Sequence, residues 1–477
     1  MTHSHHDHAG PASLSRRSFL NRALLASGAA AVAVMASSCG TSSSSSSTSS
    51  PASSVGGGPG AAPGGGTDIV SYADFKGLTT DGNVVPDLYA VHSTGVSTAK
   101  VVAAGTAFVA TLTDDQKKET LYDVAADQWL NWSNVHNFPR NGLQLMDMTA
   151  AQQKAGLELL AAALSAKGLQ TSNNIRKLNH VAGRLLGQLD QFDEGRYFFT
   201  VMGTPSASEP WGFQFQGHHL VVNYFILGDQ VVMTPTFMGS EPRMGYYDDG
   251  TKIDLFTDEL AGGIAMINAL DATQQKKAIT STTKGGAVSQ AEAGKDNVEV
   301  PYAGIKASEL TSAQQTQLMD LAGLFIGNMD DGHAKVKMAE VKDHLDTTYF
   351  AWTGETTDDA AFYMRIQSPV IYIEFDCESG GPASGAVEAA ADAANATKSG
   401  VATGQGGGGG EGAPSADATA GGPPSGGPGG GGSAGGGGGT GGGGTASRNH
   451  IHSVVRTPNG NDYGFDLLKD HLATHPH

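Results

Sequence analysis

Residues 211–223 read WGFQFQGHHLVVN, and they set two adjacent histidines, His218 and His219, in an otherwise apolar run. The β-branched and aromatic residues that follow predict a strand, so the two histidines fall at its start. A second pair, His450 and His452, lies in HIHSVVR, far downstream beyond a glycine-rich tract. We expect folding to bring the two stretches together and to build a polar, metal-binding site.

Four segments of the chain carry the same helix-start pattern, in which an apolar residue precedes Thr or Asp and Gln follows three residues later. The Thr or Asp oxygen accepts a free amide of the first helical turn, and the Gln side chain reaches back to complete a capping box. The four starts are at Thr113, Thr149, Asp271 and Thr311. The first two lie 36 residues apart and the last two 40, so the segments form two similar pairs.

The sequence that follows each pair is also similar. Tyr197-Phe198 is matched by Tyr349-Phe350, Gln216 by Gln367, and Asn223 by Glu374. These matches predict an internal duplication, with halves at about residues 68–230 and 231–377, each a set of helices followed by a β-hairpin. Because helices and strands come in blocks, we expect an α+β fold, one compact unit with an antiparallel or mixed sheet.

The N-terminal residues resemble an export signal. Arg16 and Arg17 stand in SRRSFL, a twin-arginine pattern, and residues 23–36 form an apolar run too short to remain as a membrane-spanning helix. Cys39 follows in a sequence similar to a lipobox, so we expect a signal peptide at 1–38 and a Ser/Gly-rich tether at 39–67. The predicted location is the cell envelope or the outside of the cell, with Cys39 as a possible lipid anchor.

Residues 378–448 are dominated by Gly, Ala, Ser and Pro, and they cannot bury enough apolar surface to fold, so we expect a disordered insertion. Enlarging a loop to about 70 residues costs only ~2 kcal/mol of closure entropy. Residues 371–376 and 450–455 can therefore still pair as two arms of a hairpin. On this interpretation residues 449–477, a strand and a helix, complete the globular domain at 68–377.

The composition excludes several classes of protein. With 29 Lys and Arg against 47 Asp and Glu, the chain lacks the basic balance of a nucleic-acid-binding protein. Its two cysteines, Cys39 and Cys377, exclude a disulfide framework and a cysteine-based zinc site. No G-x-S-x-G elbow between a strand and a helix, H-E-x-x-H helix or P-loop is found.

The strongest chemical signal is His450-Ile451-His452, because residues i and i+2 of a strand point to the same face. Successive residues alternate faces, so only one of His218 and His219 should join them. Glu374, on the strand expected beside His450, completes a set suited to a divalent metal ion of unknown identity. The alternative is that these histidines only form hydrogen bonds and that Glu374 is a solvated strand end.

Two further residues are candidates for catalysis. Glu241 follows TPTFMGS in a loop, where a carboxylate can act as an acid or a base, although it can equally be an ordinary turn residue. Arg456 could hold a carboxylate or phosphate of a small-molecule substrate, or it could pair with Asp376 or Asp462 of the protein itself.

Taken in order, the motifs WGxxxxGHHL, TPxFxGxEP, IExD, HIHxVxRxP and DYGxDLLxxH resemble the bacterial family known only as domain of unknown function 3500. The resemblance covers about residues 70–477 apart from the glycine-rich insertion. It implies exported proteins but no reaction. Three functions are compatible with the residues: a metal-dependent hydrolase or oxidoreductase, a non-catalytic metal- or ligand-binding envelope lipoprotein, or a structural module of the envelope.

Overall fold

Strand β15 (Ala446–Arg456) lies at the centre of a mixed sheet of thirteen strands. The computed structural model describes residues 70–387 and 445–475. The predicted signal peptide (1–38), the tether (39–67) and residues 388–444 of the predicted insertion lie outside the described residues. All described residues fall within one compact unit.

Along its main path the sheet has the order β1-β3-β4-β5-β7-β15-β14-β13-β12-β10. The strands on the first side of β15 are β1 (Leu121–Tyr122), β2 (Leu143–Gln144), β3 (Phe198–Met202), β4 (Trp211–Gly217), β5 (Leu220–Leu227), β6 (Gln230–Val232) and β7 (Thr236–Ser240). Those on the other side are β10 (Ile279–Ser281), β11 (Ile305–Lys306), β12 (Tyr349–Thr353), β13 (Tyr363–Gln367) and β14 (Tyr372–Ser379). A separate two-stranded sheet pairs β8 (Met244–Tyr246) with β9 (Lys252–Asp254).

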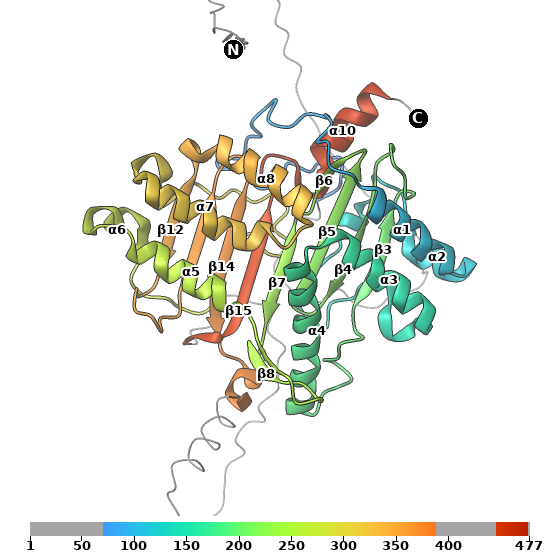
Figure 1. The fold of residues 1–477 in the computed structure, drawn as a ribbon, viewed down its shortest axis with the longest axis horizontal. Coiled ribbons are helices and arrows are strands. Elements are labelled where there is room, and N and C mark those ends of the chain that lie inside the picture. Colours follow the sequence, from blue (N-terminus) through green and yellow to red (C-terminus); the bar gives the residue numbers. More distant parts are fainter. Residues whose placement is uncertain (1–69, 388–444, 476–477) are drawn as a thin grey trace, which may run out of the picture. The chain divides into compact units, whose positions relative to one another are not determined.

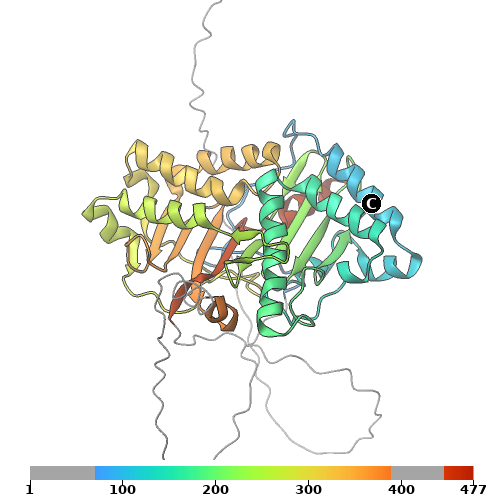
Figure 2. The ribbon, with the colours of Figure 1, turned by 60° about the horizontal axis from the view of Figure 1, so that its bottom comes forward.

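Long helices cover one face of this sheet (Figures 1 and 2). The first half contributes α1 (Ala99–Thr111), α2 (Asp114–Thr120), α3 (Ala150–Ala163) and α4 (Ala166–Leu186). The second contributes α5 (Thr257–Asn268), α6 (Ala272–Ala278), α7 (Ser312–Ile326) and α8 (Asp331–Asp343). The main core forms where Leu159, Leu178 and Leu321 of these helices meet Phe215 and Ile373 of the strands. The described residues also contain five short 3-10 helices: Asp127–Leu130, Leu145–Asp147, Ala307–Glu309, Leu345–Thr347 and Asp462–Gly464.

Loops and the C-terminal helix α10 (Phe465–Thr474) cover the opposite face, where they form a second core. Phe75, Trp132 and Tyr463 of this core pack against Phe225 and Val454 of the sheet. Two long connections also lie here, one at 123–142 between β1 and β2 and one at 282–304 between β10 and β11. They bring polar loop residues to the centre of the sheet. Among the described residues no helix is long and apolar enough to cross a membrane.

The predicted α+β fold and its internal duplication are confirmed. All four capping boxes form, at the N-termini of α2, α3, α6 and α7. The glutamines of each pair also contact each other, because Gln152 donates to Gln116 Oε1 at 2.7 Å and Gln314 donates to Gln274 Oε1 at 2.8 Å. Each half thus builds the same pair of linked helices.

Strand register corrects one of the predicted matches by a single residue. Phe198 pairs with Gln216 in the first half, and Tyr349 pairs with Gln367 in the second. Tyr349 therefore corresponds to Phe198 rather than to Tyr197. Because each half has two neighbouring aromatic residues, the sequence alone aligns Tyr349 equally well with Tyr197 or with Phe198. The strand pairing decides between them, because a register shift of one residue would move every side chain to the other face of the sheet.

The predicted hairpin between residues 371–376 and 450–455 is also confirmed. β14 and β15 are antiparallel, with Ile373 opposite Val455 and Asp376 opposite His452. β15 pairs on its other edge with β7, where His452 lies opposite Gly239. A strand from the end of the chain therefore joins the two halves of the duplication.

Candidate metal centre

The turn between β4 and β5 positions His219. Its backbone has a φ of 59°, an uncommon value for a residue with a side chain. The amide of His219 donates to Asn134 O at 3.0 Å, and its carbonyl accepts from Gly239 N at 2.8 Å. These bonds fix the turn against β7 and leave the imidazole of His219 facing β15.

His218 has different surroundings from His219. Its Nδ1 lies 2.8 Å from Asn179 Oδ1 of α4, and its ring packs edge-on against Phe192. The ring also stacks on His219, with centroids 3.8 Å apart. His218 therefore supports His219 from the side, and only His219 is in the group of potential ligands that also contains His450 and His452.

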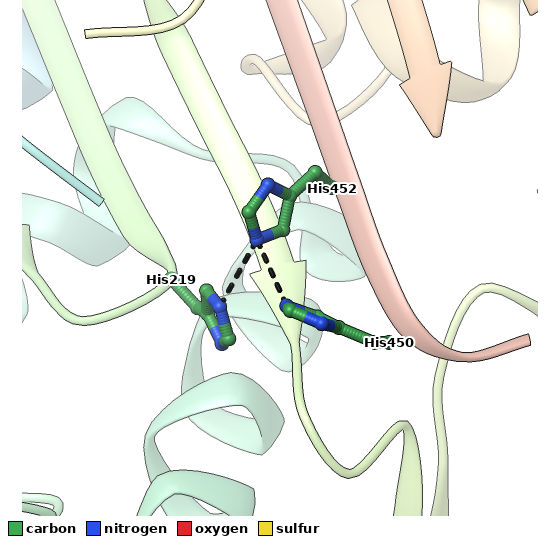
Figure 3. Close-up of side chains that lie close together, drawn as sticks. All are labelled: His219, His450 and His452. Carbon is green, nitrogen blue, oxygen red and sulfur yellow. Dashed lines mark hydrogen bonds between the residues drawn. The ribbon is translucent and has the colours of Figure 1, made fainter. Parts of the chain in front are cut away.

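Three imidazole nitrogens converge beside the middle of β15 (Figure 3). His450 Nε2 lies 3.1 Å from His452 Nε2, and His452 Nε2 lies 3.1 Å from His219 Nε2. Two imidazole nitrogens bound tetrahedrally at about 2.1 Å to one zinc ion would lie about 3.4 Å apart. Both 3.1 Å distances are therefore close to the distance between two ligands of a common ion.

The other ring nitrogens determine where the protons lie. His450 Nδ1 is 2.7 Å from Ser379 O, and a carbonyl oxygen can only accept, so Nδ1 carries the proton. His452 Nδ1 is 2.9 Å from Glu292 Oε1 and 3.0 Å from Glu378 Oε1, which again places the proton on Nδ1. In their neutral forms both rings therefore direct Nε2 lone pairs at each other, an arrangement that requires a cation or an additional proton between them.

Electrostatics favours neutral rings at two of the three histidines. Burial lowers the pKa of His219 well below its usual value, and the neighbouring histidines lower it further. Burial likewise lowers the pKa of His450, as does His452. His452 differs: burial opposes its protonation, but Glu292 and Glu378 outweigh that effect and raise its pKa. The positive charge that the site attracts is therefore centred on His452.

Glu378 and Glu292 supply the negative charge that raises the pKa of His452, and neither was predicted from the sequence. Glu378 is on β14, two residues beyond Asp376 and on the same face. Burial would raise its pKa, but the charge of His452 and a hydrogen bond with its ring hold the pKa at about 2. Glu292 comes from the 282–304 loop and accepts from Asn134 Nδ2 at 3.3 Å. The i, i+2 rule extended to Glu378 could have found the first, whereas no local pattern marks the second.

The predicted candidate Glu374 is not part of either group of potential metal ligands among the described residues. Its carboxylate is fully buried and accepts from the amides of Gln290 and Ala291 and, at 2.5 Å, from Tyr363 Oη. Burial raises its pKa to about 7. Through these contacts Glu374 holds the 282–304 loop on the sheet. It lies opposite Val454, two residues along β15 from His452.

Arg456 anchors the same loop. Its guanidinium is fully buried and donates to Asp462 Oδ2 at 2.7 Å, Asp296 Oδ1 at 3.0 Å and Ala291 O at 3.1 Å. These bonds flank Glu292 in sequence and therefore position it. The predicted pairing with Asp462 is confirmed, while a role for Arg456 in substrate binding stays a prediction.

Glu241 lies beside the site, at the end of β7. Its Oε2 is 3.9 Å from His450 Nδ1, and its Oε1 accepts from Ser384 N at 3.2 Å. It therefore faces the side of His450 that points away from the three converging nitrogens. Glu241, Glu292 and Glu378 all contact imidazoles at Nδ1, and their side chains are 15%, 21% and 13% exposed, so solvent reaches the site from their side.

The fold and site together define an α+β protein with a candidate three-histidine metal centre. A family model described as "Protein of unknown function (DUF3500)" matches residues 94–465, which includes all three histidines and the carboxylates around them. The chain belongs to this family. None of the curated proteins and none of the solved structures with which the chain was compared matches it.

Proposed function

We propose that this protein binds a divalent metal ion through Nε2 of His219, His450 and His452. The observation that carries the proposal is the convergence of three imidazoles, with His452 Nε2 3.1 Å from Nε2 of both His219 and His450, while Nδ1 of His450 and His452 is occupied by acceptors. Metal-bound histidines commonly donate their second nitrogen to a carboxylate or a carbonyl, which fixes the ring and increases its basicity. The contacts of His450 and His452 have this form.

The donor set narrows the choice of metal. Imidazole nitrogens suit zinc, copper, iron and nickel, whereas magnesium and calcium prefer oxygen ligands. Three glutamates within contact of the histidines also add negative charge that a divalent cation would balance. We therefore expect a transition metal or zinc at this centre.

A metal-dependent enzyme, a hydrolase or an oxidoreductase, is the function that this geometry supports best. Three protein ligands are typical of catalytic zinc sites, which keep a fourth position for water or substrate. An ion in such a site lowers the pKa of a bound water molecule and polarises substrate oxygens. In this protein the chain itself would hold the ion, orient the rings and supply a site that solvent reaches only in part.

A non-catalytic metal-binding protein is the second candidate, and one observation favours it. Glu241, Glu292 and Glu378 all lie at the Nδ1 side of the histidines, where they orient the rings rather than face the ion. A general base would have to approach from the Nε2 side. A site in which the protein supplies a fourth ligand would store or transfer metal without turnover.

Metal analysis of the purified full-length protein tests the proposal. We expect about one ion per chain in the wild type and less than about a tenth of that in His450→Ala/His452→Ala, because two of three ligands are lost. His344→Ala is the matched control, since His344 contacts only the backbone of α8 through Nδ1 and lies outside the group. A wild-type protein that binds no metal when refilled with zinc, copper, iron or nickel would exclude the proposal.

Cobalt substitution separates the two candidates. An open fourth position would let azide bind to the cobalt-loaded protein and shift its visible absorption spectrum. A closed set of four protein ligands would leave the spectrum unchanged at saturating azide. The first result supports an enzyme, and the second supports a metal-binding protein without catalysis.

We also propose that the protein is exported and anchored by a lipid at Cys39, on the basis of its N-terminal sequence. Replacing both Arg16 and Arg17 by Lys should retain the precursor inside the cell, because the twin-arginine pattern is lost. Cys39→Ala should release the exported protein from the membrane fraction. Normal export of the Lys variant would contradict the first part, and unchanged membrane association of the Ala variant the second.

A further inference from the structure

A cavity of about 350 Å³ lies at the end of the β7–β15 pair opposite to the histidines. Thr236 and Val455 pair at this end and line the cavity, whereas Ser240 and Ile451 pair at the histidine end. Helices α7 and α8, strand β6, the segment around residues 88–94 and Leu467 of α10 supply the remaining walls. The volume falls in the range of small-molecule sites, roughly 300–1,000 Å³.

The walls of this cavity are mostly apolar. Met233, Phe325, Met329, Ile371 and Leu467 all line it. A ligand that presents hydrocarbon to these side chains would remove apolar surface from water, which favours binding. The chemistry of the walls therefore favours a molecule with a largely apolar body.

Several polar groups around the cavity already have partners within the protein. Lys337 Nζ donates to Val370 O at 2.8 Å and pairs with Glu340. Both nitrogens of His333 are occupied, by Asp330 Oδ2 and by Asp229 O. Tyr89 Oη donates to Pro458 O at 2.8 Å. These groups hold the walls in place and have little capacity left for a ligand.

Asn461 is different. It lines the cavity and is only 4% exposed, yet its Oδ1 is buried and has no hydrogen-bond partner among the described residues. A buried carbonyl oxygen without a donor is costly, and such groups in native proteins call for an explanation. A ligand that donates an O–H or N–H to Asn461 Oδ1 would remove this cost.

The charges around the cavity are mainly negative. Glu340 and Asp343 line it, and Asp462 and Asp466 lie close enough to act on Tyr89, although Asp462 is also paired with Arg456. Burial raises the pKa of Tyr89, and Glu340, Asp462 and Asp466 raise it further. Lys337 is the one cation among the lining residues, and Glu340 pairs with it. An anionic ligand would meet repulsion in this environment.

We propose that this cavity binds an uncharged, largely apolar small molecule whose hydroxyl or N–H group donates to Asn461. The proposal is independent of the metal centre, since none of the converging histidines lines the cavity. Binding here and metal binding at the other end of the β7–β15 pair can therefore succeed or fail separately.

The test uses the full-length protein and the neutral fluorescent probe N-phenyl-1-naphthylamine. We expect saturable binding of one probe per chain, with displacement by 1-octanol and displacement at least tenfold weaker by octanoate. Val336→Trp, which fills the cavity from α8, should weaken probe binding at least tenfold. Leu189→Trp is the matched control, because Leu189 is exposed and does not line the cavity.

The role of Asn461 is tested with two ligands of similar length. Asn461→Leu should weaken displacement by 1-octanol about tenfold and leave displacement by 1-chlorooctane, which has no donor, unchanged. Circular dichroism would establish that the variants are folded. Probe fluorescence that does not saturate, or that Val336→Trp does not change, would overturn the proposal. Equal competition by octanoate would overturn the uncharged class, and equal loss for both ligands would overturn the contact with Asn461.

Discussion

His452 uses its two ring nitrogens for different contacts. Nδ1 faces Glu292 and Glu378, and Nε2 faces His219 and His450. The two glutamates belong to segments that are about 85 residues apart in the chain. A ring held in this way has one orientation. In its neutral form it has one proton position, on Nδ1, so its Nε2 lone pair is then available to a cation.

Removing either glutamate should therefore weaken the metal centre without removing a ligand. We expect Glu292→Gln and Glu378→Gln each to lower metal affinity about 10- to 100-fold, the usual effect of losing the carboxylate behind a metal-bound histidine. Competition with a chromophoric chelator measures the affinity. Glu309→Gln, on an exposed residue outside the group, is the control. Affinities that match the wild type in both variants would contradict the assigned contacts.

Glu374 predicts a pH dependence of stability. Its folded-state pKa is raised to about 7 from 4.5 by burial, so the folded protein holds this proton more tightly than the unfolded chain. The resulting stabilisation is complete below about pH 4.5 and is lost as the pH rises to about 7, a change of about 3 kcal/mol.

In Glu374→Gln this loss should be absent, because the amide does not titrate. The new NH₂ group meets the amides of Gln290 and Ala291, which adds a cost that does not vary with pH. Urea unfolding between pH 5 and pH 8 measures the difference between variant and wild type. A difference that stays constant over this range would show that Glu374 is ionised throughout.

For individual residues, the sequence could indicate which residue types belong to the site but not which groups they contact. The alternation of strand side chains was enough to predict that one of His218 and His219 joins His450 and His452. It could not say which, because that depends on the positive φ of His219 and its bonds to Asn134 and Gly239. Glu292 could not be predicted, since only the folding of a long loop brings it to His452.

At the scale of elements, capped helix pairs give the molecule its duplicated form. Thr149 caps α3 and Thr311 caps α7, each with a Gln three residues on that completes the box. Gln152 and Gln314 also link these helices to α2 and α6, through Gln116 and Gln274. These interactions are local, which is why the sequence alone could predict them.

Equivalent caps should have equivalent energies. We expect Thr149→Ala and Thr311→Ala each to lower the free energy of unfolding by about 1 kcal/mol, the usual cost of losing an N-cap. Chemical denaturation measures the change. Thr316→Ala is the control, since Thr316 lies inside α7 and bonds only to Ser312 O of its own helix. A loss at one cap and none at the other would contradict the equivalence of the two halves.

Two glycines at equivalent positions, Gly142 and Gly304, also support the equivalence of the two halves. Gly142 has a φ of 96°, and a Cβ there would lie 2.2 Å from Phe199 O. Gly304 has a φ of 90°, and a Cβ there would lie 2.0 Å from Phe350 O. Both positions precede the short strand that pairs with β3 or β12. The strand register that the two halves share was harder to predict than the helix caps, because it depends on pairing across the sheet rather than on local sequence.

For the molecule as a whole, β15 decides both sites. Its middle contributes His450 and His452 to the metal centre, and its C-terminal end contributes Val455 to the cavity. When the strands of the two halves are matched, the turn at His218–His219 is equivalent to the turn at Pro369–Val370. The turn at Pro369–Val370 lies near the cavity, which the adjacent Ile371 lines. The duplication therefore places similar hairpin turns at the two ends of the central strands. One end is rich in histidine and glutamate, and the other is mostly apolar.

Shortening the connection before β15 tests how the strand is held. Residues 380–445 link β14 to β15, and Ser379 and Ala446 are already paired across the two strands. Replacing residues 388–444 by eight Gly and Ser residues should leave metal affinity unchanged and raise the free energy of unfolding by about 1–2 kcal/mol, because closing a shorter loop costs less entropy. Metal titration and urea unfolding measure the two quantities. Loss of metal binding would show that the long connection is needed to place His450 and His452.

X-ray absorption at the zinc edge of the zinc-loaded protein tests the metal centre most directly. We expect imidazole scattering from three histidines with Zn–N distances of about 2.0–2.1 Å. His219→Ala should reduce the imidazole contribution, while His218→Ala should keep all three. A spectrum dominated by oxygen ligands, or one that His219→Ala leaves unchanged, would contradict a three-histidine centre.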